Sequence, residues 1–246
     1  MSRKLHRFLN AALPKCSRRA LKRAALASIP SLRHYDMPTR LRRLQQLGFD
    51  PRSIVDVGAG SGQWAQMAAD IWPSARIFGV EPNLAELPLL EQVRDSLSNF
   101  DFVQGVLGPQ RRAVQYRSAG HQTSLLDSDT AATETAQMYV LDEMVAEGRI
   151  LSPQFIKLDV QGFELEVLRG AANALRACDG VLLEVNLYEF LPGAATVAET
   201  MAFFRERDFV LYDVAGVLRR PSDDALWQMD MVFLPVEHRL REQKEY

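Results

Sequence analysis

A glycine-rich turn is the first feature of this sequence that could do chemistry. The segment V-D-V-G-A-G-S-G begins at Val55 and runs directly into a helical pattern. Glycines in a strand-to-helix turn let a ligand approach the backbone closely, and the following helix N-terminus attracts polar ligand groups. In open α/β sheets, ligands bind at the carboxyl ends of the strands. The turn therefore predicts a nucleotide-type cofactor site with Gly58, Ala59 and Gly60 in its wall.

The acids near this turn indicate which cofactor it suits. A dinucleotide fingerprint would place its third glycine at position 63, which is Gln63. Asp56 stands just before the turn, where its carboxylate suits the ammonium of S-adenosylmethionine and would repel a pyrophosphate. Glu81 ends the next expected strand, where an acid can accept hydrogen bonds from ribose hydroxyls. The pattern favours S-adenosylmethionine over NAD, and Gln104 on the following strand is a further cofactor-binding candidate.

A second motif, F-I-K-L-D-V-Q-G-F-E-L-E-V-L-R-G-A, begins at Phe155 and predicts a buried strand, a turn and a helix. Side-chain alternation places Lys157 and Asp159 on the same face of that strand. Isolated charges are costly to bury, so Asp159 is either a structural partner of Lys157 or a catalytic group. Glu184 on the next strand and His121 in a long loop are the other catalytic candidates, although a lone loop histidine seldom identifies a site.

These motifs resemble those of the FkbM family of S-adenosylmethionine-dependent methyltransferases. That family carries V-D-V-G-A-N-x-G, an E-P pair and K-x-D-V-E-G-x-E-x-x-V-L-x-G-A. The matching stretches here are VDVGAGSG, the pair Glu81–Pro82 and KLDVQGFELEVLRGA. The stretches VLDEM, from Val140, and LLEVN, from Leu182, fit further elements of the family. The resemblance covers roughly residues 41–235, in the family's order.

Two positions depart from the family pattern. Gly60 replaces a common Asn, and the smaller residue leaves the cofactor turn unobstructed. Gln161 replaces a common Glu, which removes a carboxylate near the expected acceptor site and puts any catalytic role for that position in doubt. The resemblance implies methyl transfer from S-adenosylmethionine to a hydroxyl oxygen of a small-molecule or carbohydrate acceptor. Such a displacement needs an aligned acceptor and a destination for its proton, and Asp159 is the first candidate for both tasks.

The elements that must position these residues alternate along the chain. Apolar runs predict strands over 53–58, 75–82, 101–108, 113–117, 155–160, 180–186, 209–216 and 229–235. Helical patterns separate most of them, over 63–71, 85–97, 135–147, 163–177 and 196–207. This order predicts an α/β fold with the Rossmann-like sheet of class I methyltransferases, mostly parallel. No convincing helix joins the last two strands, which predicts a C-terminal antiparallel hairpin strand. The loops 109–134 and 187–196 are expected to shape the acceptor pocket.

Composition and charge set the remaining expectations. The 246 residues are 47% hydrophobic and 24% charged, which suits one α/β domain with a short appendage. Residues 1–43 hold twelve Lys or Arg against one acid, whereas the remainder holds 17 bases against 30 acids. We therefore divide the chain into a basic helical extension, 1–40, and a methyltransferase domain, 41–246. An acidic body is unsuited to nucleic acid. For residues 1–29, a helix packed on the domain is favoured over contact with a membrane surface.

Other features narrow the class of protein. The sequence contains no run of eighteen apolar residues, so no membrane span is predicted. Its two cysteines are far apart, which indicates free thiols in a reducing, cytoplasmic setting. No clustered acids suggest a magnesium site, so no metal is expected. A non-catalytic S-adenosylmethionine-binding subunit stays open as an alternative, as does an NAD-linked oxidoreductase. The sequence does not decide the acceptor, the choice between O- and N-methylation, or the oligomeric state.

Overall fold

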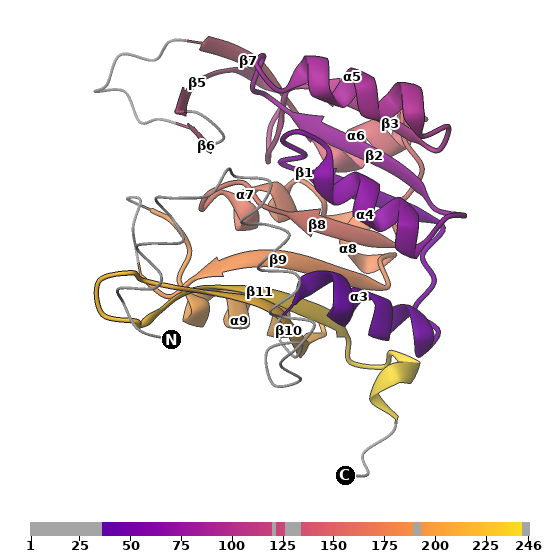
Figure 1. The fold of residues 1–246 in the computed structure, drawn as a ribbon, viewed down its shortest axis with the longest axis vertical. Helices are drawn as coiled ribbons and strands as arrows, with labels where there is room; N and C mark the ends of the chain where they lie inside the picture. Colours follow the sequence, from indigo (N-terminus) through magenta and orange to yellow (C-terminus); the bar gives the residue numbers. More distant parts are fainter. Residues whose placement is uncertain (1–35, 120–121, 126–133, 189–192, 243–246) are drawn as a thin grey trace, which may run out of the picture.

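A seven-stranded sheet forms the centre of the protein, in the order β10-β11-β9-β8-β1-β2-β3 (Figure 1). The computed structural model describes residues 36–119, 122–125, 134–188 and 193–242. The parallel strands are β1 (Ser53–Val57), β2 (Arg76–Glu81), β3 (Phe100–Gln104), β8 (Phe155–Leu158) and β9 (Gly180–Asn186). At the carboxyl end of the chain, β11 (Leu226–Pro235) runs antiparallel to both β9 and β10 (Phe209–Arg219). The predicted mostly parallel sheet with a C-terminal antiparallel hairpin strand is confirmed.

The strand order reverses between β1 and β8. From β1 the chain proceeds outward through β2 to β3, and it then returns to the other side of β1 to add β8 and β9. The carboxyl ends of two strands that lead away in opposite directions leave a crevice between their loops. Both motifs singled out in the sequence end at this crevice, since one follows β1 and the other spans β8.

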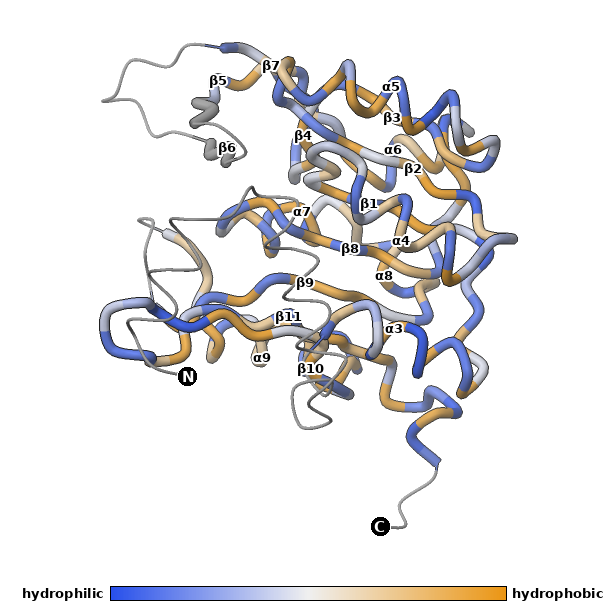
Figure 2. Tube along the Cα trace, viewed as in Figure 1, coloured by the Kyte–Doolittle hydropathy of each residue, from blue (hydrophilic) through white to orange (hydrophobic). Residues whose placement is uncertain are grey.

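Helices cover both faces of the sheet and define two hydrophobic cores. One face is covered by α3 (Met37–Gln46), α4 (Gln63–Ile71) and α5 (Leu87–Ser96). The opposite face is covered by α6 (Leu141–Ala146), α7 (Glu164–Arg169), α8 (Ala172–Arg176) and α9 (Val197–Arg205). A short 3-10 helix, η2 (Arg239–Arg241), follows β11. The central strands are apolar along most of their length, as Figure 2 shows, because parallel strands covered on both faces bury all their side chains.

The face covered by α3 and α4 changes character along the strands. Near the amino ends its core residues include Ile54, Phe155 and Leu182. Two residues further along each strand, the alternation of side chains returns to the same face. At those positions the residues are charged, and they are Asp56, Lys157 and Glu184. The carboxyl end of this face is therefore a polar strip above an apolar core.

A second, four-stranded sheet is inserted after β3, in the order β4-β7-β5-β6. Its strands are β4 (Val106–Leu107), β5 (Arg112–Ala119), β6 (Gln122–Leu125) and β7 (Glu134–Tyr139). Much of the segment 109–134, expected to be one short strand and a long loop, is thus β-structure, and residues 120–121 and 126–133 lie outside the described residues. The expected strand 101–108 is interrupted at Gly105, so its two halves belong to different sheets.

The prediction of a single helix over 135–147 is wrong. Residues Glu134–Tyr139 form β7, and only Leu141–Ala146 are helical. Ala136 and Met138 are buried, whereas Thr135 is exposed. This alternation of burial has the period of two residues that a strand requires. The expected helix 163–177 is likewise two helices, since Gly170 packs too closely on the Gly108 carbonyl for any Cβ to fit.

The amino-terminal extension lies mostly outside the described residues. The predicted boundary at residue 40 falls inside α3, whose Leu41 and Leu44 are buried in the core. Asp36 caps this helix by accepting a hydrogen bond from the backbone N–H of Thr39. The basic segment 1–29 and its predicted packing stay predictions. Among the described helices, none has the length and apolar character needed to cross a lipid bilayer.

Candidate active site

A cavity of about 350 Å³ opens at the crevice between β1 and β8. This volume lies within the range of small-molecule sites. Four segments form its wall: the turn after β1, the end of β2, the start of the inserted sheet and the end of β8. Its residues are Val57, Gly58, Ala59, Gly60, Ser61, Gln63, Trp64, Val80, Glu81, Pro82, Gly105, Val106, Leu107, Lys157, Asp159, Val160, Gln161 and Phe163. The wall combines apolar and charged side chains, as a site for an amphipathic ligand requires.

The two glycines of the turn serve different purposes. Gly58 has φ +75°, and a Cβ built on it would lie 2.0 Å from the backbone oxygen of Asp159. This glycine therefore permits close packing of the β1 turn against the end of β8. Gly60 has φ +51°, and no described atom lies within 4 Å of a Cβ placed there. Its position faces open space, and an Asn, the residue common in the family, also tolerates this conformation.

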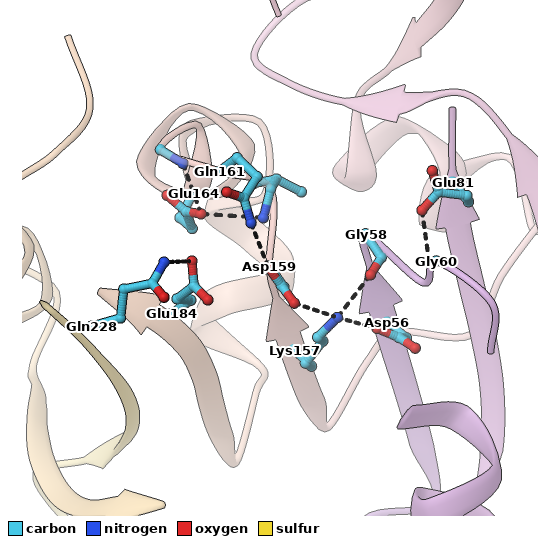
Figure 3. A network of polar contacts seen from close by, with 12 residues as sticks. Asp56, Gly58, Gly60, Glu81, Lys157, Asp159, Gln161, Glu164, Glu184 and Gln228 are labelled. Carbon is cyan, nitrogen blue, oxygen red and sulfur yellow. Dashed lines mark hydrogen bonds and ion pairs between the residues drawn. The ribbon is translucent and has the colours of Figure 1, made fainter. Parts of the chain in front are cut away.

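Glu81 holds the turn in place from the end of β2. Its carboxylate accepts a hydrogen bond from the backbone N–H of Gly60, at 2.7 Å (Figure 3). It also accepts one from the backbone N–H of Asn83, at 2.9 Å. Burial raises the pKa of Glu81, and these two hydrogen bonds oppose the shift. A carboxylate has about four acceptor positions, so two are left for ligand hydroxyls at the cavity wall. This geometry permits Glu81 to accept hydrogen bonds from ribose hydroxyls, and that role stays a prediction.

Asp56 is oriented away from a direct cofactor contact. Its side chain is completely buried, it is absent from the cavity wall, and its carboxylate lies 2.9 Å from the ammonium of Lys157. We therefore revise the expectation that Asp56 itself meets a ligand ammonium. Burial raises the pKa of Asp56 and Lys157 opposes it. For Lys157, burial lowers the pKa but the carboxylates of Asp56 and Asp159 outweigh it, so the net shift is upward.

Lys157 is the residue that sequence reasoning underrated. Its ammonium donates to the Gly58 carbonyl at 2.8 Å and lies 3.8 Å from the carboxylate of Asp159, so it joins the turn after β1 to the end of β8. Asp56 stands directly opposite Lys157 in the β1–β8 pairing. The pair could have been identified from the expectation that β1 and β8 are neighbouring strands. In that arrangement, an acid from each of the two motifs lies beside the same lysine.

The tight turn after β8 presents Asp159 to the cavity. Buried Glu164 accepts backbone N–H groups of Val160 and Gly162, and Gln161 adopts φ +55°. The Gln161 amide donates to the Asp159 carboxylate at 3.3 Å. The Asp159 side chain retains 43% exposure, so its carboxylate is the accessible acid of this wall. Gln161 therefore acts here as a donor that steadies Asp159, a task that the family's common Glu would perform only when protonated.

Glu184 lies beside this turn on β9, outside the wall of the cavity itself (Figure 3). It accepts a hydrogen bond from the Gln228 amide at 2.7 Å. Burial raises the pKa of Glu184 to about 8, and the carboxylates of Asp159 and Asp230 add to the shift. Asp230, opposite Glu184 on β11, has its pKa raised to about 6 by burial and by Asp159.

The remaining candidates take other places. Gln104 ends β3 outside the cavity wall, and its amide donates to the Pro82 carbonyl at 3.2 Å, so it supports the loop after Glu81. Buried Tyr116 of β5 reaches the same carbonyl with its hydroxyl at 2.6 Å, which ties the inserted sheet to that loop. His121 lies outside the described residues. In the part of the chain that the structure describes, no three His, Cys, Asp or Glu are arranged to hold a metal ion, and the expectation of no metal stays a prediction.

The sheet order and the position of the cavity define a class I methyltransferase fold. Two solved structures share it at low sequence identity. A methyltransferase FkbM from Methylobacillus flagellatus is 17% identical with a TM-score of 0.55; the alignment covers 93% of this chain and 57% of that one. The magnesium protoporphyrin IX methyltransferase ChlM of Synechocystis, solved with bound S-adenosylmethionine, is 9% identical with a TM-score of 0.50; the alignment covers 91% of this chain and 86% of that one.

The chain belongs to the FkbM methyltransferase family. The family's model, described as the methyltransferase FkbM domain, matches residues 56–211, from the buried acid of β1 into β10. Among curated proteins, the hexuronic acid methyltransferase AglP of Haloferax volcanii is 28% identical over 173 residues, which are 63% of this chain and 68% of AglP. The expected resemblance is confirmed.

Proposed function

We propose that this protein transfers a methyl group from S-adenosylmethionine to a hydroxyl oxygen of a small-molecule or carbohydrate acceptor. The observation that carries the proposal is one cavity that joins the glycine turn and Glu81 on its one side to the accessible carboxylate of Asp159 on the other. Membership in the FkbM family supports methyl transfer, and the hexuronic acid specificity in the name of AglP supports a sugar-type acceptor.

The residues of the cavity fit the proposed cofactor. S-adenosylmethionine would supply an electrophilic methyl group on a sulfonium. The carboxylate of Glu81, fixed by two backbone N–H groups, would hold ribose hydroxyls. The open space at Gly60 would admit the ligand close to the backbone. The apolar wall includes Trp64, Val106 and Phe163, which suit the face of a base.

The charges at the crevice suit a cationic ligand. Asp56 and Lys157 neutralise each other, and Asp159 adds one negative charge at the cavity wall. A net negative environment stabilises a bound sulfonium or ammonium by Coulomb attraction, which is stronger in a partly buried cavity than in water. We infer that Asp56 contributes by fixing Lys157, and that Lys157 fixes the turn and Asp159.

Asp159 is the group proposed to act on the acceptor. Its carboxylate is exposed to the cavity and restrained by Gln161 and Lys157, so it can accept a hydrogen bond from an incoming hydroxyl in a set orientation. Holding the acceptor in line with the methyl group can supply a large part of the rate enhancement of a direct displacement. A carboxylate in this position can also receive the proton that the hydroxyl loses.

The test is turnover with mass detection of the product. Wild-type protein, incubated with S-adenosylmethionine and a panel of hydroxylated acceptors, is expected to release S-adenosylhomocysteine and add one methyl group to an acceptor oxygen. Asp159→Asn keeps the shape of the side chain and is expected to lower kcat at least about a hundredfold, in the range of general-base losses. Tight S-adenosylmethionine binding with no turnover on any acceptor would instead identify a non-catalytic binding subunit.

A further inference from the structure

A row of acidic side chains crosses the sheet from the cavity wall to β9 and β11. Asp159 lies at the cavity wall, and Glu184 and Asp230 follow on the next two strands of the sheet. The three carboxylates are close enough for Asp159 to raise the pKa of both others. The three side chains point to the same face because of strand alternation, and that face carries Phe155, Leu182 and Val232 in its core.

The pairing of β9 with β11 places the two outer acids together. Glu184 is directly opposite Asp230, so their side chains stand side by side on one face. Two like charges opposite each other would destabilise the sheet, and burial, which raises the pKa of Glu184 to about 8 and that of Asp230 to about 6, opposes ionisation of both acids at once. On the neighbouring strand, Gly216 leaves the space that Asp230 fills, since a Cβ there would lie 2.1 Å from the Asp230 carboxylate. The fold thus leaves space for two acids side by side although their burial is costly, which indicates that the pair has a function.

A buried amide at the end of the same strip lacks a partner. Asn186 is 2% exposed, and its side-chain oxygen has no hydrogen-bond donor in the part of the chain that the structure describes. It stands two residues after Glu184 and opposite Gln228, so strand alternation aims it at the same face. A buried acceptor without a donor costs free energy, and a ligand that brings a hydroxyl or ammonium donor would satisfy it.

We propose that Asp159, Glu184, Asp230 and Asn186 form an acceptor subsite that selects a polyhydroxylated acceptor without negative charge, either neutral or an amine. This inference rests on the proposed methyl transfer and names its substrate class. Every one of these four groups offers acceptor atoms for ligand O–H or N–H donors. The nearest cation, Lys157, is already neutralised by Asp56, so it leaves little attraction for an anionic acceptor.

The proposal separates this chain from the relative named for hexuronic acid. A hexuronate carries a carboxylate, and placing it beside Asp159 and Asp230 adds like-charge repulsion in a partly buried site. An amino sugar of the same ring size gains attraction at the same place. Charge, rather than ring shape, is therefore the property that distinguishes accepted from rejected acceptors.

The test compares three acceptors that share one ring: a methyl hexoside, the corresponding methyl 2-amino-2-deoxyhexoside and the methyl hexuronoside. Binding to protein saturated with S-adenosylhomocysteine is measured by calorimetry, and methylation is measured with S-adenosylmethionine. The variants are the isosteric Glu184→Gln/Asp230→Asn pair and the matched control Glu206→Gln, an exposed acid at the end of α9. Circular dichroism verifies the fold of each variant.

The wild type and the control are expected to prefer the neutral and amino hexosides over the hexuronoside by about tenfold or more, the effect of one nearby like charge. The double variant is expected to reduce that preference to about twofold. Equal or better use of the hexuronoside by the wild type would overturn the proposal, as would a preference unchanged by the double variant or the absence of binding by all three. Binding of S-adenosylhomocysteine tests the proposed function separately. If the protein does not bind S-adenosylhomocysteine, the proposed donor site is wrong, whereas the charge preference is judged from the acceptors alone.

Discussion

The two halves of the crevice are formed by different chemical groups, backbone groups in one and side-chain carboxylates in the other. On the side of β1 and β2, backbone groups and glycine conformations form the wall, and Glu81 has two backbone N–H partners. On the side of β8, β9 and β11, side-chain carboxylates from three strands form the surface, and burial raises the pKa of Glu184 and Asp230. Each half holds a buried polar atom without a described hydrogen-bond partner, the Trp64 indole N–H in the first and the Asn186 amide oxygen in the second. Only the second half also places two half-buried acids, Glu184 and Asp230, opposite each other.

This difference indicates where the protein is rigid and where it is specific. A turn fixed by its own backbone offers the same surface to one cofactor throughout a family. Burial of Glu184 and Asp230 disfavours their ionised forms, and an acceptor with donor groups offsets part of that cost. Side-chain groups of this kind can be changed by single substitutions. Lys157 stands between the halves and contacts both of them. Substitutions in the two halves should therefore separate stability from specificity.

Lys157→Met is expected to have the largest effect. It removes the only cation beside the fully buried Asp56 in the described structure, and an uncompensated buried charge costs about 3–5 kcal/mol. The free energy of unfolding in urea should fall by that amount. The double variant Asp56→Asn/Lys157→Met should recover much of the loss, since it removes both charges. A loss below about 1 kcal/mol in the single variant would show that the pair does not join the two halves.

The glycines of the turn should differ from each other. Gly58→Ala places a Cβ against the Asp159 carbonyl and should lower the free energy of unfolding by about 2–4 kcal/mol, the usual range for overpacking at a strained position. Gly60→Asn, which introduces the family's common residue, should change it by less than about 1 kcal/mol. Thermal unfolding of the two variants measures the contrast. Equal losses would mean that the turn does not pack on β8 as described.

Glu184→Gln should stabilise the protein, and its effect should depend on pH. The folded protein holds the Glu184 proton up to about pH 8, whereas the unfolded chain releases it near pH 4.5. The unfolded state therefore binds fewer protons between these values, and wild-type stability falls as pH rises through that window. The neutral Gln avoids this loss, so the variant should gain on the order of 1–2 kcal/mol at pH 8 and almost nothing at pH 4, with the partial exposure of the side chain limiting the gain. Urea unfolding at both pH values measures it, and a gain that does not grow with pH would contradict the raised pKa.

Tyr116→Phe should have a small effect on stability. It removes the hydroxyl that lies 2.6 Å from the Pro82 carbonyl and 2.5 Å from the Glu134 carboxylate, at a cost of about 1 kcal/mol for the one hydrogen bond that its proton can donate. The loop after Glu81 would lose its tie to the inserted sheet, so binding of S-adenosylmethionine should weaken about three- to tenfold. Calorimetry of the variant measures this. Unchanged cofactor affinity would show that the inserted sheet does not support the cofactor half.

The sequence predicted the cofactor half better than the acceptor half, for a physical reason. The turn after β1 is local, so its glycines and the strand-end Glu81 are visible in short motifs. The acceptor half depends on which strands are neighbours: Asp56 meets Lys157 only because β1 adjoins β8, and Glu184 meets Asp230 only because β11 inserts beside β9. The mistaken helix over 135–147 has a similar origin, since the six-residue strand β7 is followed almost directly by helix α6 and its short alternation is hard to separate from the helical pattern.

The most direct test of the central claim is calorimetric titration of the purified protein with S-adenosylmethionine, repeated with Glu81→Ala and with the exposed control Glu206→Gln. Saturable binding is expected for the wild type and for the control, with affinity reduced at least about tenfold in Glu81→Ala, the effect of losing a charged acceptor of ligand hydroxyls. A folded wild-type protein that shows no binding of S-adenosylmethionine would contradict the account, and the glycine turn would then serve only to pack β1 against β8.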